Sequence, residues 1–156
     1  MEKYSLEKYS LRFRICNWIY GNQLRVWLLT VRASLYNATY YYERYNSRRD
    51  IWNWKIVKYS FLCEVNHATD WLHYIMKDSH ICDGDYTSIK LSLRFRICNL
   101  IYGDRLRNIL AIDMAALYDI YQHAIRQQFN EDIPEIYLGK IRDVSRDIVN
   151  IMYKKG

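Results

Sequence analysis

The stretch Ser10–Gly21, SLRFRICNWIYG, occurs a second time as Ser92–Gly103, SLRFRICNLIYG, with one difference in twelve positions. The two stretches lie 82 positions apart, and the same register continues without a gap as far as Arg44 and Arg126. A match of this length predicts a tandem duplication. Because 82 residues alone would bury too little surface for a stable domain, we expect one compact domain over residues 1–156, made of two repeats at about 4–79 and 86–153 that pack on each other.

The composition predicts an all-α fold. The chain of 156 residues has only one proline and five glycines, with 51% hydrophobic and 26% charged residues, which is typical of continuous helices with few turns. Each repeat has the periodicity of three amphipathic helices, at about 6–20, 22–45 and 50–77 in the first repeat and at about 88–102, 104–128 and 133–153 in the second. Six such helices, each repeat forming a three-helix unit, predict a helical bundle.

Local signals predict how the first two helices of each repeat are joined. Gly21 and Gly103 occupy the position of a left-handed C-cap, and Asn22 and Asp104, which follow them, would be N-caps of the next helix. A tight corner between two helices is therefore expected in both repeats.

The spacing of apolar residues predicts which helix faces are buried. In the second helix of the first repeat, apolar positions at alternating spacings of four and three form a seam: Leu24, Leu28, Val31, Leu35, Ala38, Tyr42 and Tyr45. Leu11, Ile15 and Ile19 lie four apart on one face of the first helix, which predicts its apolar side. Cys16 and Cys98 occupy the same position in the two repeats and are interpreted as buried thiols. Asp113 takes the place of Val31, and drift of the pattern predicts that it turns outward.

The two repeats differ in aromatic content and charge. The first repeat contains all five tryptophans and ten of the sixteen tyrosines. Residues 1–50 carry nine Lys and Arg against four Asp and Glu, a net charge of +5, whereas residues 82–156 carry eleven against ten, a net charge of +1. The function is therefore expected in the basic, aromatic first repeat.

The end of its second helix combines tyrosine with arginine most densely, and three interpretations remain open. Tyrosine and arginine on a rigid helix commonly anchor protein interfaces, which makes a partner-binding site of Tyr36, Tyr40, Tyr41, Arg44 and Arg48. The same residue types can stack on bases and neutralise phosphates; the alternative is a nucleic-acid site of Arg12, Arg14, Arg44, Arg48 and Arg49. The third interpretation is that the rings fill the core and the arginines cover them.

Motifs for catalysis are missing from the sequence. It has no phosphate loop, no dinucleotide fingerprint and no serine-hydrolase elbow. Glu64, His67 and His73 share one predicted helix, but no other helix repeats this motif, as a dinuclear metal bundle would require. We interpret these three residues as a solvated polar face and expect no metal, no cofactor and no enzymatic activity.

Hydropathy and amino-acid composition predict the localisation of the protein and the kind of partner that it binds. No apolar run approaches the roughly 18 residues of a membrane span, and the first ten residues do not resemble a signal peptide. We expect a soluble, intracellular binding protein with a protein partner, weak nucleic-acid binding at most and no membrane partner. Exposed aromatic residues would favour a homo-oligomer. The abundance of Tyr, Asn, Ile and Lys is typical of AT-rich genomes, including those of viruses and mobile elements.

Overall fold

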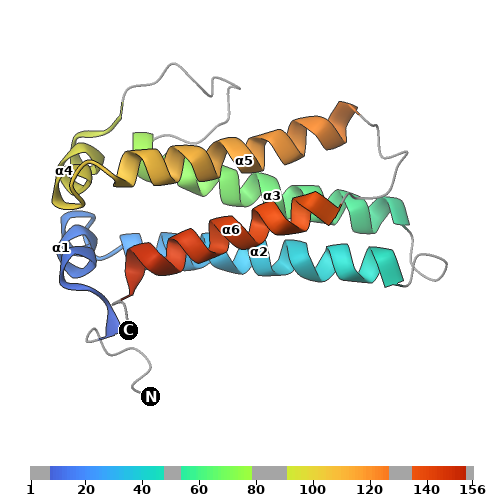
Figure 1. The fold of residues 1–156 in the computed structure, drawn as a ribbon, viewed down its shortest axis with the longest axis horizontal. Coiled ribbons are helices and arrows are strands. Elements are labelled where there is room, and N and C mark those ends of the chain that lie inside the picture. The colour runs from blue at the N-terminus through green and yellow to red at the C-terminus, as the bar shows by residue number, and fades with distance from the viewer. Residues whose placement is uncertain (1–7, 48–53, 79–90, 127–134, 154–156) are drawn as a thin grey trace.

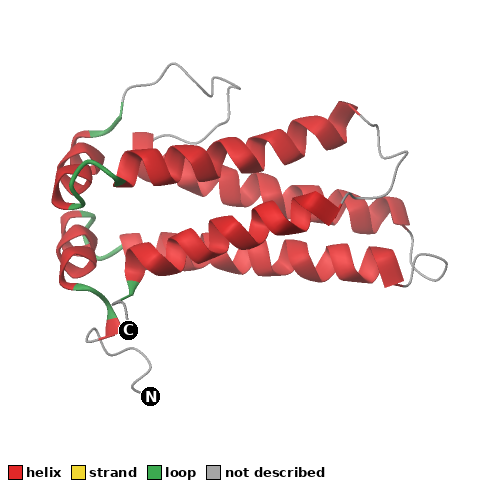
Figure 2. Cartoon of the chain, in the orientation of Figure 1, coloured by secondary structure: helices red, strands yellow, loops and turns green. Residues whose placement is uncertain are grey.

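The regular secondary structure is helical wherever the computed structural model describes the chain, which is at residues 8–47, 54–78, 91–126 and 135–153 (Figures 1 and 2). Six helices occupy these ranges: α1 (Leu11–Ile19), α2 (Leu24–Ser47), α3 (Trp54–Lys77), α4 (Leu93–Ile101), α5 (Leu106–Arg126) and α6 (Glu135–Met152). The predicted all-α class is thereby confirmed. The connection between the two predicted repeats, at residues 79–90, lies outside the described residues.

Four long helices form a closed bundle that is capped by two short ones. Around the bundle, α2 packs on α3, α3 on α5, α5 on α6, and α6 on α2. Neighbouring helices run in alternating directions, so α2 and α5 begin at the end where α3 and α6 finish (Figure 1). At this end, α1 and α4 lie side by side and contact each other (Figure 1).

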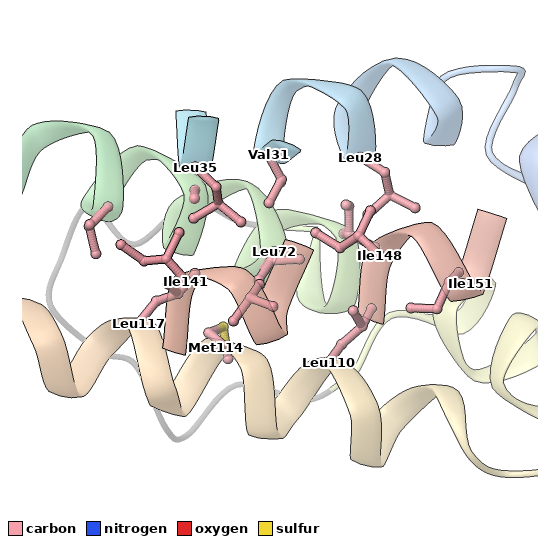
Figure 3. Packing of buried hydrophobic residues seen from close by; sticks show 14 of the residues in the cluster. Leu28, Val31, Leu35, Leu72, Leu110, Met114, Leu117, Ile141, Ile148 and Ile151 are labelled. Carbon is pink, nitrogen blue, oxygen red and sulfur yellow. The ribbon is translucent and has the colours of Figure 1, made fainter. Parts of the chain in front are cut away.

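The core lies along the bundle axis, where apolar side chains of all four long helices point toward one another (Figure 3). The seam predicted for α2 is buried from Leu24 to Tyr42, while the side chain of Tyr45 lies outside the described part of the chain. The labelled core residues in Figure 3 are Leu28, Val31, Leu35, Leu72, Leu110, Met114, Leu117, Ile141, Ile148 and Ile151.

The corner between α1 and α2 ends α1 with a Schellman motif. Gly21 has φ of +65°. Its N–H donates to the carbonyl of Trp18 at 2.9 Å, and the N–H of Asn22 donates to the carbonyl of Asn17 at 2.8 Å. Gly103 has φ of +66° at the equivalent corner before α5. Both predicted left-handed caps are confirmed.

The prediction that Asn22 and Asp104 are N-caps is wrong. Both residues have positive φ, whereas an N-cap residue has extended backbone. The capping oxygen comes from the preceding helix instead: Asn17 Oδ1 accepts a hydrogen bond from the N–H of Arg25 at 2.8 Å, and Asn99 Oδ1 accepts one from Arg107 at 2.8 Å. The corner is so tight that the last turn of one helix lies within hydrogen-bond reach of the first turn of the next.

The ends of α3 and α6 are each closed by one hydrogen bond from their own half and one from the other half. The carbonyl of Ile75, at the end of α3, accepts a hydrogen bond from the Tyr20 hydroxyl at 2.5 Å, and the next carbonyl, of Met76, accepts one from the N–H of Ser92 at 2.9 Å. Helix α6 ends with the same pattern, in the pairs Tyr102 with Ile151 at 2.7 Å and Ser10 with Met152 at 3.1 Å. Carbonyls that have no partner within their own helix are thus satisfied by α1, by α4 and by the segments that precede them.

The start and the buried side of α1 differ from the prediction. The helix begins at Leu11 rather than near residue 6, because the Ser10 hydroxyl caps it by accepting the N–H of Phe13 at 3.1 Å. Its side toward the bundle is formed by Phe13, Cys16 and Tyr20. Leu11 and Ile15, predicted to be buried, are 64% and 42% exposed. Leu11 and Ile15 of the predicted stripe therefore lie on the outer side of the helix, whereas Ile19 is partly buried and packs against the core.

Cys16 and Cys98 are fully buried where α1 meets α4, which confirms the prediction of buried thiols. A hydrogen bond between the two thiols, together with burial, raises the pKa of Cys16. The same hydrogen bond lowers the pKa of Cys98, so the two thiols interact directly at the contact between the halves.

Candidate functional site

Exposed aromatic rings lie on the outer side of α2, as the spacing of its seam predicts. Tyr36 is 73% exposed and Tyr40 is 44% exposed, whereas Tyr42, on the seam, is buried. Tyr41 is half-buried and packs against the core. We call Tyr36, Tyr40, Tyr41 and Arg44 the tyrosine face; Arg48, predicted to belong to the same site, lies outside the described residues.

Ring contacts order part of this surface. The centroids of the Tyr40 and Tyr41 rings lie 5.6 Å apart at an interplanar angle of 70°. The guanidinium carbon of Arg44 lies 5.3 Å from the centroid of Tyr40, within the range of a cation–π interaction. These contacts hold Tyr40 between a second ring and a positive charge, so the surface is ordered before any partner binds.

A cleft of about 170 Å³ opens beside Tyr36, between α2 and α6. Its apolar residues are Leu35 and Ile141, and its polar ones are Arg32, Tyr36, Thr39, Arg142 and Ser145. The Nε atom of Arg32 is buried, and no described residue accepts a hydrogen bond from it. Two guanidinium groups above an apolar floor suit a carboxylate attached to an apolar chain, because arginine binds carboxylates through paired hydrogen bonds.

The arginines predicted for nucleic acid do not come together. Arg12 and Arg14 lie on α1, at the capped end of the bundle, whereas Arg44 lies near the far end of α2, roughly 30 Å away at 1.5 Å per residue (Figure 1). The guanidinium carbon of Arg12 lies 4.5 Å from the centroid of the Tyr102 ring, across the contact between the halves. Arg49 lies outside the described residues.

A second exposed surface, which the sequence did not predict, lies on α1 and α4. Both helices turn three large apolar side chains away from the bundle at the same spacing. We call these six residues the end face, with exposed fractions of 64% for Leu11, 42% for Ile15, 73% for Trp18, 64% for Leu93, 41% for Ile97 and 70% for Leu100.

Positive charge surrounds the end face. Residues 11–27 and 93–109 contain seven arginines and one acidic residue, Asp104, a net charge of +6 that equals the net charge of the whole chain. Arg96, Arg105 and Arg107 are exposed, and none of them forms an ion pair with another described residue. Lys77 and Asp78, at the end of α3, add one charge of each sign here, and Asp78 forms an ion pair with Arg94.

The polar residues predicted as a solvated face of α3 are partly buried. The Nε2 atom of His67 accepts a hydrogen bond from the Trp71 indole at 3.2 Å, so in the neutral imidazole the proton is on Nδ1, which lies 2.8 Å from the Ser34 hydroxyl. His73 is fully buried. The interpretation as a solvated face is therefore wrong for His73, which points into the bundle. Within the described ranges, no three His, Cys, Asp or Glu side chains are grouped as metal ligands.

Asp113 is buried, with 2% of its surface exposed, which contradicts the predicted outward orientation. The seam of α5 keeps the register of α2, so the carboxyl group takes the inward position that Val31 has in the first half. Desolvation, followed by a hydrogen bond to Asp147 and the negative charges of Asp147 and Asp143, raises the pKa of Asp113 to about 9. This carboxyl group is therefore protonated at neutral pH and shares its site with the Asp147 carboxylate.

The first half has an aromatic cluster on its α2 and α3 side. The Trp27 and Trp71 rings stack with centroids 5.8 Å apart, and Tyr74 contacts both rings edge-on. Arg94 of the second half lies with its guanidinium carbon 5.5 Å from the Trp27 ring. The tryptophans of the first half therefore contribute in part to packing between helices.

None of the described helices is both long and apolar enough to cross a membrane. Comparison with protein-family models, with curated protein sequences and with solved structures found no match for this chain.

Proposed function

We propose that the chain is a small, non-enzymatic binding protein that acts through protein–protein interaction, with the tyrosine face of α2 as its docking surface. The observation that carries this proposal is the exposure of Tyr36, at 73%, beside a cleft lined by Arg32, whose buried Nε atom has no hydrogen-bond acceptor among the described residues. Rings on a rigid helix bury a large area on binding and lose little conformational freedom.

The cleft supports a partner with an acidic side chain next to an apolar one. A carboxylate between Arg32 and Arg142 would supply the acceptor that the Arg32 Nε atom lacks. An apolar neighbour of that carboxylate would cover Leu35 and Ile141. The hydroxyl groups of the cleft add polar contacts that fix the orientation of the partner.

We also infer that the chain arose by tandem duplication of a three-helix unit. The near identity of residues 10–21 and 92–103 supports this inference, as do the matching caps, corners and helix-end hydrogen bonds of the two halves. In this view Tyr36 and Arg44 have counterparts in Tyr118 and Arg126, whereas Tyr40 and Tyr41 correspond to Gln122 and His123, so the paired rings of the tyrosine face belong to the first half alone.

Site-specific photo-crosslinking tests the docking surface. A photoreactive phenylalanine analogue replaces Tyr36 in one variant and Tyr118, its equivalent in the second half, in a control variant. After irradiation in lysate of the natural host, we expect one protein adduct from position 36, none from position 118, and no loss of the adduct on nuclease treatment. An adduct that nuclease removes would favour the nucleic-acid alternative, and equal adducts from both positions would contradict a role for the tyrosine face.

A further inference from the structure

The end face contains six exposed large apolar side chains, and its residues occupy matching positions in the two halves. Leu11 and Leu93 are equally exposed at 64%, and Ile15 and Ile97 differ by a single percentage point, at 42% and 41%. Scattered exposed leucines are ordinary on proteins. Three exposed apolar side chains at matching positions on each of two helices that contact each other are more than scattered residues and indicate an interaction surface.

The fold does not require these side chains. The same helices already bury their other side, where Phe13 and Phe95 are at most 1% exposed. The Ser10 and Ser92 hydroxyls cap the two helices at their starts, and the glycine corners end them. The contacts of the described residues therefore do not account for the apolar residues on the outer side of α1 and α4.

A groove of about 460 Å³ lies next to the part of the end face on α4. Apolar side chains of Leu91, Leu93, Ile97 and Leu100 line it. Polar and charged residues at its border are Arg96, Asn99, Asp104 and Arg107. This arrangement, an apolar floor with two arginines at the border, accepts apolar side chains presented by a segment that carries negative charge.

The positive charge around the end face makes some of the molecules that could cover it more favourable partners than others. A second copy of the chain would bring two surfaces of net charge +6 together, which costs free energy at physiological salt. An acidic segment has the complementary charge. An amphipathic helix also presents apolar residues at spacings of three and four, the spacings found in the stripe of each end-face helix.

We propose that the end face and its groove dock an acidic amphipathic helix of a partner protein. This proposal goes beyond the tyrosine face and is independent of it, because Tyr36 and Tyr40 lie on α2, toward the opposite end of the bundle. Apolar side chains of the partner helix enter the groove beside Leu93 and Leu100, and its carboxylates face the arginines at the border.

The probe is a fluorescent peptide of about 18 residues, long enough to form a helix on binding, with leucines on one helical face and glutamates elsewhere. A peptide of the same composition in scrambled order is the control. By fluorescence anisotropy we expect saturable binding of the amphipathic peptide only, weakening as salt rises from about 50 to 200 mM because the ion pairs are exposed.

Matched variants locate the binding site. Leu93→Glu with Leu100→Glu places two charges on the end face, and Ile112→Glu with Ile136→Glu places two charges at positions of similar exposure, 67% and 65%, on α5 and α6. We expect at least tenfold weaker peptide binding for the first pair and unchanged binding for the second. Tyr36→Ala with Tyr40→Ala should also leave peptide binding unchanged, which separates this proposal from the proposed function.

Three results would overturn the proposal. Equal binding of the scrambled peptide would mean that the end face does not recognise a helix. Sedimentation with phosphatidylserine vesicles, without binding of the amphipathic peptide, would assign the end face to a lipid surface. A dimer in analytical ultracentrifugation that Leu93→Glu with Leu100→Glu dissociates would assign it to a second copy of the chain.

Discussion

The guanidinium carbon of Arg94 lies 4.5 Å from the centroid of the Tyr20 ring, so a side chain of the second half covers a buried ring of the first. Arg94 also forms an ion pair with Asp78 at 3.0 Å. Two charge contacts therefore converge where the halves meet, and the ring contact recurs at the equivalent arginine, Arg12, over Tyr102.

Arg94→Ala should lower the free energy of unfolding by about 1–2 kcal/mol, because it removes a cation–π contact and an ion pair that is only partly exposed. Arg96→Ala is the matched control, since it removes the same charge from an exposed position two residues away and should change stability by no more than about 0.5 kcal/mol. Urea titration measures both. Equal losses would indicate that net charge, rather than the contact with Tyr20, accounts for the effect.

Gly21→Ala should cost about 1 kcal/mol, because residue 21 has φ of +65°, where a Cβ atom is unfavourable. Gly139→Ala provides the opposite case: this glycine is inside α6 and a Cβ atom there meets nothing within 4 Å, so helix propensity should stabilise the protein by up to about 1 kcal/mol. Thermal unfolding followed by circular dichroism compares the two variants. A stabilising Gly21→Ala would contradict the left-handed cap.

The free energy of unfolding should fall as pH rises from about 4 to 9. Asp113 has an ordinary pKa of 3.8 when unfolded and of about 9 when folded, so the folded protein binds the extra proton between these values. The slope is at most about 1.4 kcal/mol per pH unit for one group. Asp113→Asn keeps a neutral side chain at every pH and should flatten this dependence. Urea titrations at pH 5 and 8 test this, and an unchanged slope in the variant would be contrary evidence.

Tyr40→Ala with Arg44→Ala should leave helicity and the melting temperature nearly unchanged but abolish partner binding, since truncation of anchor residues costs about 2 kcal/mol or more each. Tyr59→Ala, at an α3 tyrosine that is 61% exposed, is the control and should bind normally. Calorimetry and the crosslinking assay provide the two measurements. An unfolded double variant would assign these residues to the core, and a folded variant that binds normally would place the interface elsewhere.

The sequence predicted the helices, the glycine caps and the α2 seam, because these depend on local periodicity and backbone preference. The buried side of α1 could not be predicted in this way. Leu11, Ile15 and Ile19 form one apolar stripe, while Phe13, Cys16 and Tyr20 form another, and only the position of α1 across the bundle end decides between them. The tyrosine face followed from the seam, since Leu35 and Tyr42 turn Tyr36 outward.

Long-range contacts account for the other differences. The capping of α2 by Asn17 depends on how tightly the corner closes, which no spacing rule specifies. Aspartate is seldom buried in proteins, so residue type did not predict the burial of Asp113. Its partner, Asp147, lies on another helix. The end face required knowledge of which surfaces α1 and α4 leave uncovered, and the sequence alone assigned its leucines to the core.

The contact between α1 and α4 has the form of an isologous dimer interface contained in one polypeptide. In a true homodimer every substitution is present in both subunits. A carboxyl group introduced in one subunit would therefore also be present in the other. Here a single gene encodes both sides of the contact, so a mutation can change one side without changing the other. Symmetry is retained where Cys16 meets Cys98 and is broken away from that axis, where Val31 faces the core in one half and Asp113 in the other. The two halves of the molecule can thus differ from each other while the contact between α1 and α4 retains the stability of a symmetric interface.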